Sequence, residues 1–264
     1  MNKKIYFIAG QTRSGSELLC NILAQNPRFD ATATSGIMDV IFGTRNQWDN
    51  LLEFKATPND EAKKRVMKAM LQSYYNTDKP VVFDKCRGWT MYAEMAKELL
   101  DHDVKILVPV RDLRQVLSSW EKLYRKEAGK KQSHLEKLDY FKAQTVQGRC
   151  ELLLREDQPV GLAHNRILDA LQRGWKDNMF FVDYDDLTFN PKEIMKAIHR
   201  FLGEEEFEYD FNNIVQVTES NDSVYGFKDL HKIRKEVKPQ QPDWETVLGS
   251  WAKDYDQMNF WKVK

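Results

Sequence analysis

The sequence predicts a three-layer α/β fold in which a central, mostly parallel β-sheet is flanked by helices. Short apolar runs without polar alternation recur along the chain, and such runs are typical of parallel strands that are buried on both faces. Segments with helical periodicity separate them, as expected when helices connect parallel strands. The clearest runs span residues 5–9, 81–83, 106–110 and 180–182, and residues 29–33 form a fifth candidate.

The helix that follows the run at 106–110 has a clear start and a clear apolar face. Asp112 is a candidate N-cap, and Gln115 stands at the third helical position, where a capping-box partner belongs. An apolar stripe with helical spacing follows, which predicts one buried face. Its members are Leu113, Val116, Leu117, Trp120 and Leu123.

Two further helices are predicted in the last third of the chain. Asn190, Pro191 and Glu193 form an N-cap, a first-turn proline and a capping-box carboxylate, and Gly203 is a C-terminal stop. Tryptophans and aliphatic residues between 244 and 251 predict a final amphipathic helix. We therefore expect one domain over residues 1–264, with a helical segment at about 240–264.

The composition restricts the functional classes. In 264 residues, 40 basic and 40 acidic side chains cancel, so no overall field favours nucleic acid. No run of about 18 apolar residues is present, so we expect no membrane span. The three cysteines have neither metal-site nor disulfide spacing, which favours a reducing compartment such as the cytoplasm.

The most informative motif lies directly after the first apolar run. Gly10 and Gly15 bound a loop between a predicted strand and a predicted helix, the arrangement whose backbone N–H groups bind phosphate. The loop is P-loop-like, but Ser16 and Glu17 stand where a nucleoside triphosphatase needs Lys and Ser/Thr. Arg13 is the only cation in it. These substitutions indicate a nucleotide other than a metal-bound triphosphate.

Basic residues follow several of the predicted strands. Ligands of such sheets bind at the carboxyl ends of the strands, so these side chains are expected to converge on the edge that carries the loop. Pairing with nearby aspartates is the alternative for any one of them. The residues are Arg13, Lys85, Arg87, Arg111 and Arg114.

Three ordered motifs resemble the sulfotransferases that use 3′-phosphoadenosine 5′-phosphosulfate (PAPS). Residues 12–19, TRSGSELL, look like the family's 5′-phosphosulfate loop. Residues 110–119, VRDLRQVLSS, are similar to its 3′-phosphate motif, with an Arg at the strand end and a Ser eight positions later. Residues 182–203 resemble its Tyr-Glu-Asp-Leu…Pro…Phe-Leu-Gly segment. Each motif alone is short, and their order makes the set specific.

The resemblance implies a set of site residues and no metal. Arg13 is expected to stabilise charge on the leaving group, and Lys85 matches a family lysine near the sulfonate. Residues 223–234 resemble a late segment that closes over the nucleotide, although an ordinary surface loop is an equal alternative. The expected donor-binding residues are Thr12, Arg13, Ser14, Gly15, Ser16, Glu17, Arg111, Ser119, Tyr184 and Arg234.

The catalytic base departs from the family pattern. Thr34 stands where tyrosylprotein members carry a Glu, and a threonine hydroxyl does not accept a proton at neutral pH. Asp39 and His231 are the candidate replacements.

The sequence therefore favours a PAPS-dependent sulfotransferase that acts on a hydroxyl or amine of a small-molecule, carbohydrate or peptide acceptor. An ATP-dependent kinase is disfavoured by Ser16 and Glu17, and an inactive nucleotide-binding protein is suggested by Thr34. Residues 36–80 and 121–160 are expected to shape the acceptor pocket, and they carry no recognisable specificity motif.

Overall fold

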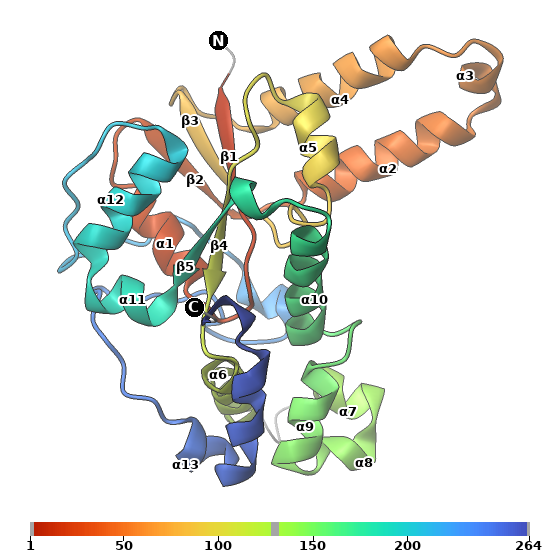
Figure 1. Ribbon diagram of the computed structural model, residues 1–264. Helices are drawn as coiled ribbons and strands as arrows, with labels where there is room; N and C mark the ends of the chain where they lie inside the picture. Colours follow the sequence, from red (N-terminus) through yellow and green to blue (C-terminus); the bar gives the residue numbers. More distant parts are fainter. Residues whose placement is uncertain (1–2, 128–131, 263–264) are drawn as a thin grey trace.

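A five-stranded, all-parallel sheet forms the centre of the computed structural model, which describes residues 3–127 and 132–262 (Figure 1). All five predicted runs form strands, in the spatial order β2-β3-β1-β4-β5. The predicted parallel α/β architecture is thus confirmed. The strands are β1 (Lys4–Ile8), β2 (Phe29–Thr34), β3 (Val81–Lys85), β4 (Ile106–Val110) and β5 (Met179–Asp183).

The register of the sheet aligns the ends of β1 and β3, whereas β4 extends three residues beyond them. Ile8, the last residue of β1, pairs with Lys85 at the end of β3 on one side and with Leu107 of β4 on the other. The loop after β1 therefore emerges between its two neighbours, and residues that follow β3 and β4 flank it.

Helices cover both faces of the sheet, because the strands alternate their side chains between two apolar clusters. Ile5 and Phe7 of β1 belong to one cluster, and Tyr6 and Ile8 belong to the other. One face carries α1 (Ser16–Leu23), α11 (Tyr184–Phe189) and α12 (Pro191–Leu202), and the opposite face carries α2 (Ile37–Asn50), α4 (Asp60–Tyr74), α5 (Ala93–Leu99) and α10 (Pro159–Gln172).

A third apolar cluster lies beyond the carboxyl ends of the strands. It is built on α6 (Leu113–Glu127), whose predicted stripe of five residues is entirely buried. The start of this helix differs in part from expectation: Asp112 Oδ1 accepts a hydrogen bond from Arg114 N (3.0 Å), while the Gln115 side chain faces Asp243. Packed around α6 are α7 (His134–Leu138), α9 (Val146–Leu153), α13 (Trp244–Leu248) and the 3-10 helix η3 (Ser250–Met258), and α8 (Tyr140–Ala143) joins α7 to α9.

Two predicted helices, the one after residue 190 and the final one, differ in part from expectation. Asn190 is the N-cap of α12, but its side chain makes no capping hydrogen bond, and Glu193 bonds to Lys196 instead of closing a capping box. Gly203 ends the helix with a left-handed φ of 73°, as predicted. The final helix is interrupted, because Gly249 (φ 106°, ψ 161°) separates α13 from η3.

Three helices in the stretch 36–80 form an arm that projects from the body of the molecule (Figure 1). α2 and α4 run along the arm, and α3 (Leu52–Ala56) lies at its tip. The remaining short elements are the 3-10 helices η1 (Lys176–Asn178), η2 (Asp222–Tyr225) and η4 (Phe260–Lys262). Within residues 3–127 and 132–262, no helix has the length and apolar character needed to cross a membrane.

Candidate functional site

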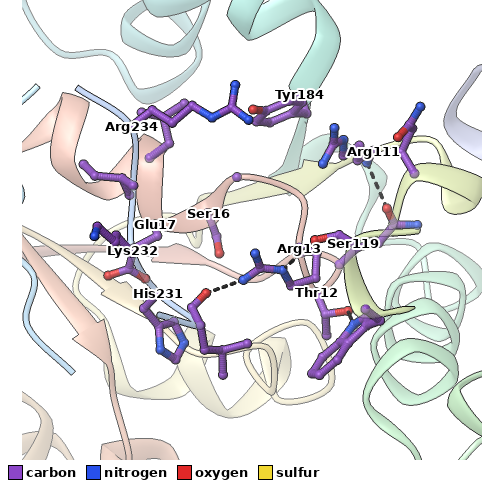
Figure 2. Close-up of a pocket in the computed structure, with 18 of the residues that line it drawn as sticks. Thr12, Arg13, Ser16, Glu17, Arg111, Ser119, Tyr184, His231, Lys232 and Arg234 are labelled. Atoms are coloured by element: carbon purple, nitrogen blue, oxygen red, sulfur yellow. Dashed lines mark hydrogen bonds between the residues drawn. The ribbon is translucent and has the colours of Figure 1, made fainter. Parts of the chain in front are cut away.

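A cavity of about 460 Å³ opens at the carboxyl ends of the strands (Figure 2). Its walls include the loop after β1, the ends of β3 and β4, the start of α11 and the late segment around residue 231. Of the residues that we expected to bind the donor or stabilise the transfer, all line this cavity except Ser14, whose hydroxyl donates to the carbonyl oxygen of Gln11 (2.7 Å) within the loop.

The phosphate-type loop has the backbone that its sequence predicts. Gly15 has a φ of 85° and caps α1, which begins at Ser16. A Cβ on Gly15 would lie 2.5 Å from the ring of Tyr184, so only glycine fits there. Arg13 also has a positive φ, 56°, which is uncommon for a residue with a side chain. The unpaired N–H groups of the first turn of α1 therefore begin beside this tightly held loop.

Arg13 joins two parts of the site that are distant in sequence. Its Nε donates to Ser119 Oγ (3.0 Å) on α6, and its Nη1 donates to the carbonyl oxygen of Leu230. Burial lowers the pKa of Arg13, and the nearby positive charge of Arg111 acts in the same direction. Two guanidinium groups thus share one cavity, which favours an anion between them.

Arg111 is held by a backbone hydrogen bond and by the ring of Tyr184, and the Nε of its side chain is available to a ligand. Its N–H donates to Gln11 Oε1 (2.9 Å), and its guanidinium carbon lies 4.3 Å from the centroid of the Tyr184 ring. Its Nε is buried and has no hydrogen-bond partner among the described residues. A buried donor of this kind is costly unless a ligand supplies the acceptor.

Glu17 and Lys85 form a buried ion pair on the opposite side of the loop. The Glu17 carboxylate also accepts a hydrogen bond from the Thr218 hydroxyl, and Asn21 Nδ2 donates to the same hydroxyl (2.7 Å). Although Glu17 lies in the phosphate-type loop, its negative charge is therefore neutralised by Lys85. These contacts also anchor residues 217–218 on α1.

The late segment forms one side of the cavity. His231, Lys232 and Arg234 lie on that side, and Arg111 and Ser119 lie on the other (Figure 2). His231 is fixed by Asp222, which contacts its Nδ1 (2.5 Å) and its backbone N–H (2.9 Å). Burial alone would raise the pKa of Asp222, but the hydrogen bonds from His231 hold it below its usual range.

Several expectations about the cavity need revision. Arg114 does not reach it, because its guanidinium pairs with Asp112 and Asp256. Thr34 and His231 line the cavity and Asp39 does not. The stretch 36–80 contributes no residue to the described lining, whereas 121–160 contributes three. Lys232 and Lys238 also line the cavity wall, and the sequence analysis did not predict them because they follow no strand. Their closeness in sequence to Arg234 was the feature that could have indicated them.

Comparisons with solved structures show related folds at low sequence identity. The sulfotransferase domain of the Synechococcus PCC 7002 olefin synthase matches with a TM-score of 0.51 and 17% identity, covering 100% of this chain and 96% of that one. A sulfotransferase from Alicyclobacillus acidocaldarius matches with a TM-score of 0.51 and 14% identity, covering 98% of this chain and 94% of that one. Retinol dehydratase, solved with androsterone and the inactive cofactor PAP, matches with a TM-score of 0.52 and 15% identity. The match covers 98% of this chain and 81% of that one.

A comparison with curated proteins gave no match. The family comparison is more informative, because the model of the sulfotransferase domain matches residues 3–240, nearly the whole chain. That stretch contains the phosphate-type loop, Arg111, Ser119 and the late segment. The chain therefore belongs to the sulfotransferase domain family.

Proposed function

We propose that the cavity binds PAPS and that the sulfonate is transferred to a hydroxyl or amine of a small-molecule, carbohydrate or peptide acceptor, with release of adenosine 3′,5′-bisphosphate (PAP). One observation carries the proposal: the buried Nε of Arg111 has no hydrogen-bond partner in the part of the chain that the structure describes, and the charge of Arg13 adds to that of Arg111. A phosphate between them would supply both the missing acceptor and the missing negative charge.

The residues fit a donor with two anionic ends. Thr12 to Glu17 with the first turn of α1 would hold the 5′-phosphosulfate, and Arg111 with Ser119 would hold the 3′-phosphate. Tyr184 supports both, since its ring packs on Gly15 and under the Arg111 guanidinium. Arg234 is exposed on the facing wall, where its guanidinium can contact the nucleotide.

In the transfer, the acceptor atom bonds to sulfur while the bond from sulfur to the 5′-phosphate oxygen breaks. Negative charge then grows on the leaving phosphate, where we assign Arg13 as the stabilising group. Lys85 would contact the sulfonate oxygens, and its ion pair with Glu17 keeps its charge fixed at the end of β3.

For the base we propose His231. It lines the cavity, and Asp222 at its Nδ1 orients the ring so that Nε2 is the proton-accepting nitrogen. Asp39 lies outside the described lining, and the Thr34 hydroxyl is not basic. The acceptor's proton would pass to His231 as the sulfur–acceptor bond forms.

The first experiment is calorimetric titration with PAP, with 5′-AMP, and with ATP plus Mg²⁺. Metal-independent binding of PAP, tighter than that of 5′-AMP, is expected because only PAP offers a 3′-phosphate. Tightest binding of ATP with Mg²⁺ would instead favour the kinase alternative. Transfer of radiolabelled sulfonate from PAPS to a panel of acceptors then separates an active enzyme from a protein that only binds the nucleotide.

A further inference from the structure

The cavity has a second region that the proposed donor site does not use. Its wall directly follows Lys85, the residue that we place at the sulfonate, so it lies on the side where an acceptor must approach. The lining residues of this region come from the end of β3, the starts of α7 and α10, and the late segment. They are Cys86, Arg87, His134, Pro159, Tyr225 and Phe227.

Arg87 is the charged residue of this region, and its side chain has no partner among the described residues. Its side chain is exposed and makes no hydrogen bond or ion pair with any described residue. Two of the other cations that follow strands are paired: Lys85 pairs with Glu17, and Arg114 pairs with Asp112 and Asp256. Arg13 and Arg111 belong to the proposed donor site. Arg87 is therefore the available cation on the acceptor side of the cavity.

The surroundings of Arg87 are those of a binding site rather than an open surface. Although solvent reaches it through the cavity, the protein encloses it enough that burial lowers its pKa, and the charge of Arg166 adds to this effect. Arg166, on α10, has a buried Nε without a partner among the described residues. Two enclosed guanidinium groups without a carboxylate are unfavourable unless an anion joins them.

The rest of this region is apolar. Phe227 packs edge-on against Trp120 (ring centroids 5.5 Å apart) and against His134 (6.1 Å). Burial lowers the pKa of His134, so this ring adds no positive charge at neutral pH. A ligand here would meet one cationic anchor and an aromatic wall.

From this arrangement we propose that Arg87, with Arg166 behind it, is an anion-binding subsite for the acceptor. The acceptor would be an organic anion, with a carboxylate or phosphate ester on Arg87, an apolar body against the aromatic wall, and a hydroxyl or amine directed to the sulfonate. The assignment of this ligand as the acceptor rests on the proposed function, whereas anion binding at Arg87 can be tested without turnover.

Cys86 provides a probe at the subsite. It is partly exposed in the cavity, whereas Cys20 and Cys150 are fully buried. The protein is first saturated with PAP so that the donor cations are occupied. Alkylation of Cys86 by iodoacetate and by neutral iodoacetamide is then followed by mass spectrometry at alkaline pH, because burial raises the pKa of this thiol.

The ratio of the two rates isolates the effect of charge, because thiolate content affects both reagents equally. Arg87→Gln should lower the iodoacetate-to-iodoacetamide ratio by about tenfold, the effect of one unit charge a few ångströms away in a partly enclosed site. Arg114→Gln, which removes a paired guanidinium outside the cavity, is the matched control and should leave the ratio unchanged. Equal ratios in the wild type and Arg87→Gln would overturn the subsite.

A second measurement does not depend on thiol reactivity. Benzoate and phenyl phosphate should bind the PAP-loaded protein in ligand-observed NMR at least about tenfold more tightly than neutral benzamide, and Arg87→Gln should abolish this preference. The two anions also distinguish carboxylate from phosphate recognition. No preference over benzamide would refute the proposal, whereas failure of PAP to bind would refute the donor assignment instead.

Discussion

Arg13 and Ser119, 106 residues apart, are hydrogen bonded at 3.0 Å between Nε and Oγ. The first belongs to the loop that we assign to the 5′-phosphosulfate, and the second to the motif that we assign to the 3′-phosphate. The two motifs therefore form one continuous site, and a substitution at either residue should alter the position of the other side chain.

Arg111→Ala should weaken PAP binding by about 2–4 kcal/mol, because a forked, charge-assisted contact with the 3′-phosphate is lost. Calorimetry measures the change. Arg114→Ala is the control, since that guanidinium pairs with Asp112 and Asp256 outside the cavity. An Arg111→Ala protein that binds PAP and 5′-AMP as the wild type does would contradict the 3′-phosphate assignment.

Arg13→Ala should lower turnover by about a hundredfold or more, while PAP affinity falls less, because the charge that Arg13 stabilises is greatest in the transition state. Steady-state kinetics with an acceptor from the panel gives kcat and KM separately. Since Arg13 also bonds to Ser119 and Leu230, Arg13→Lys should be made in parallel to keep the charge. A rise in KM at unchanged kcat would make Arg13 a binding residue only.

Lys85→Ala should lower both turnover and thermal stability, because it removes a cation from the sulfonate and leaves the buried Glu17 carboxylate unpaired. Breaking one side of such a pair costs about 3–5 kcal/mol. Adding Glu17→Gln should restore much of the stability but not the turnover, which thermal melts and rate assays can distinguish. Arg87 lines the same cavity, so part of the activity should remain. A double variant no more stable than Lys85→Ala would argue against the pair.

His231→Gln should reduce turnover and change its pH profile, because the group that accepts the acceptor's proton is removed. Asp39→Asn should leave both rate and profile unchanged, because Asp39 lies outside the described cavity lining. The turnover of Asp222→Asn should lie between those of His231→Gln and Asp39→Asn, because this change removes the carboxylate that orients the imidazole but keeps the imidazole itself. Wild-type profiles in all three variants would show that the base is elsewhere.

The sequence was sufficient for the sheet and the donor loop because both depend on local patterns. Buried parallel strands are continuous apolar runs, and the loop requires glycine at position 15. The ion-pair partners of individual basic side chains could not be predicted from local patterns. Lys85 and Arg114 both follow strands, yet their partners Glu17 and Asp256 are 68 and 142 residues away. Such pairing depends on tertiary structure, as does the arrival of Lys232 and Lys238 at the cavity.

Gly10 packs directly on the backbone of the next strand end: a Cβ there would lie 2.1 Å from the carbonyl oxygen of Pro109. The same carbonyl accepts a hydrogen bond from Gln11 N (2.9 Å), and Gln11 Oε1 accepts one from Arg111 N (2.9 Å). The main chain thus locks the start of the donor loop to the strand end that carries Arg111. The separation between the two anion positions is consequently set before any nucleotide arrives. Nucleotides would be selected by the distance between their phosphates, and a substituent larger than hydrogen at position 10 should disturb that selection by displacing the loop from Pro109.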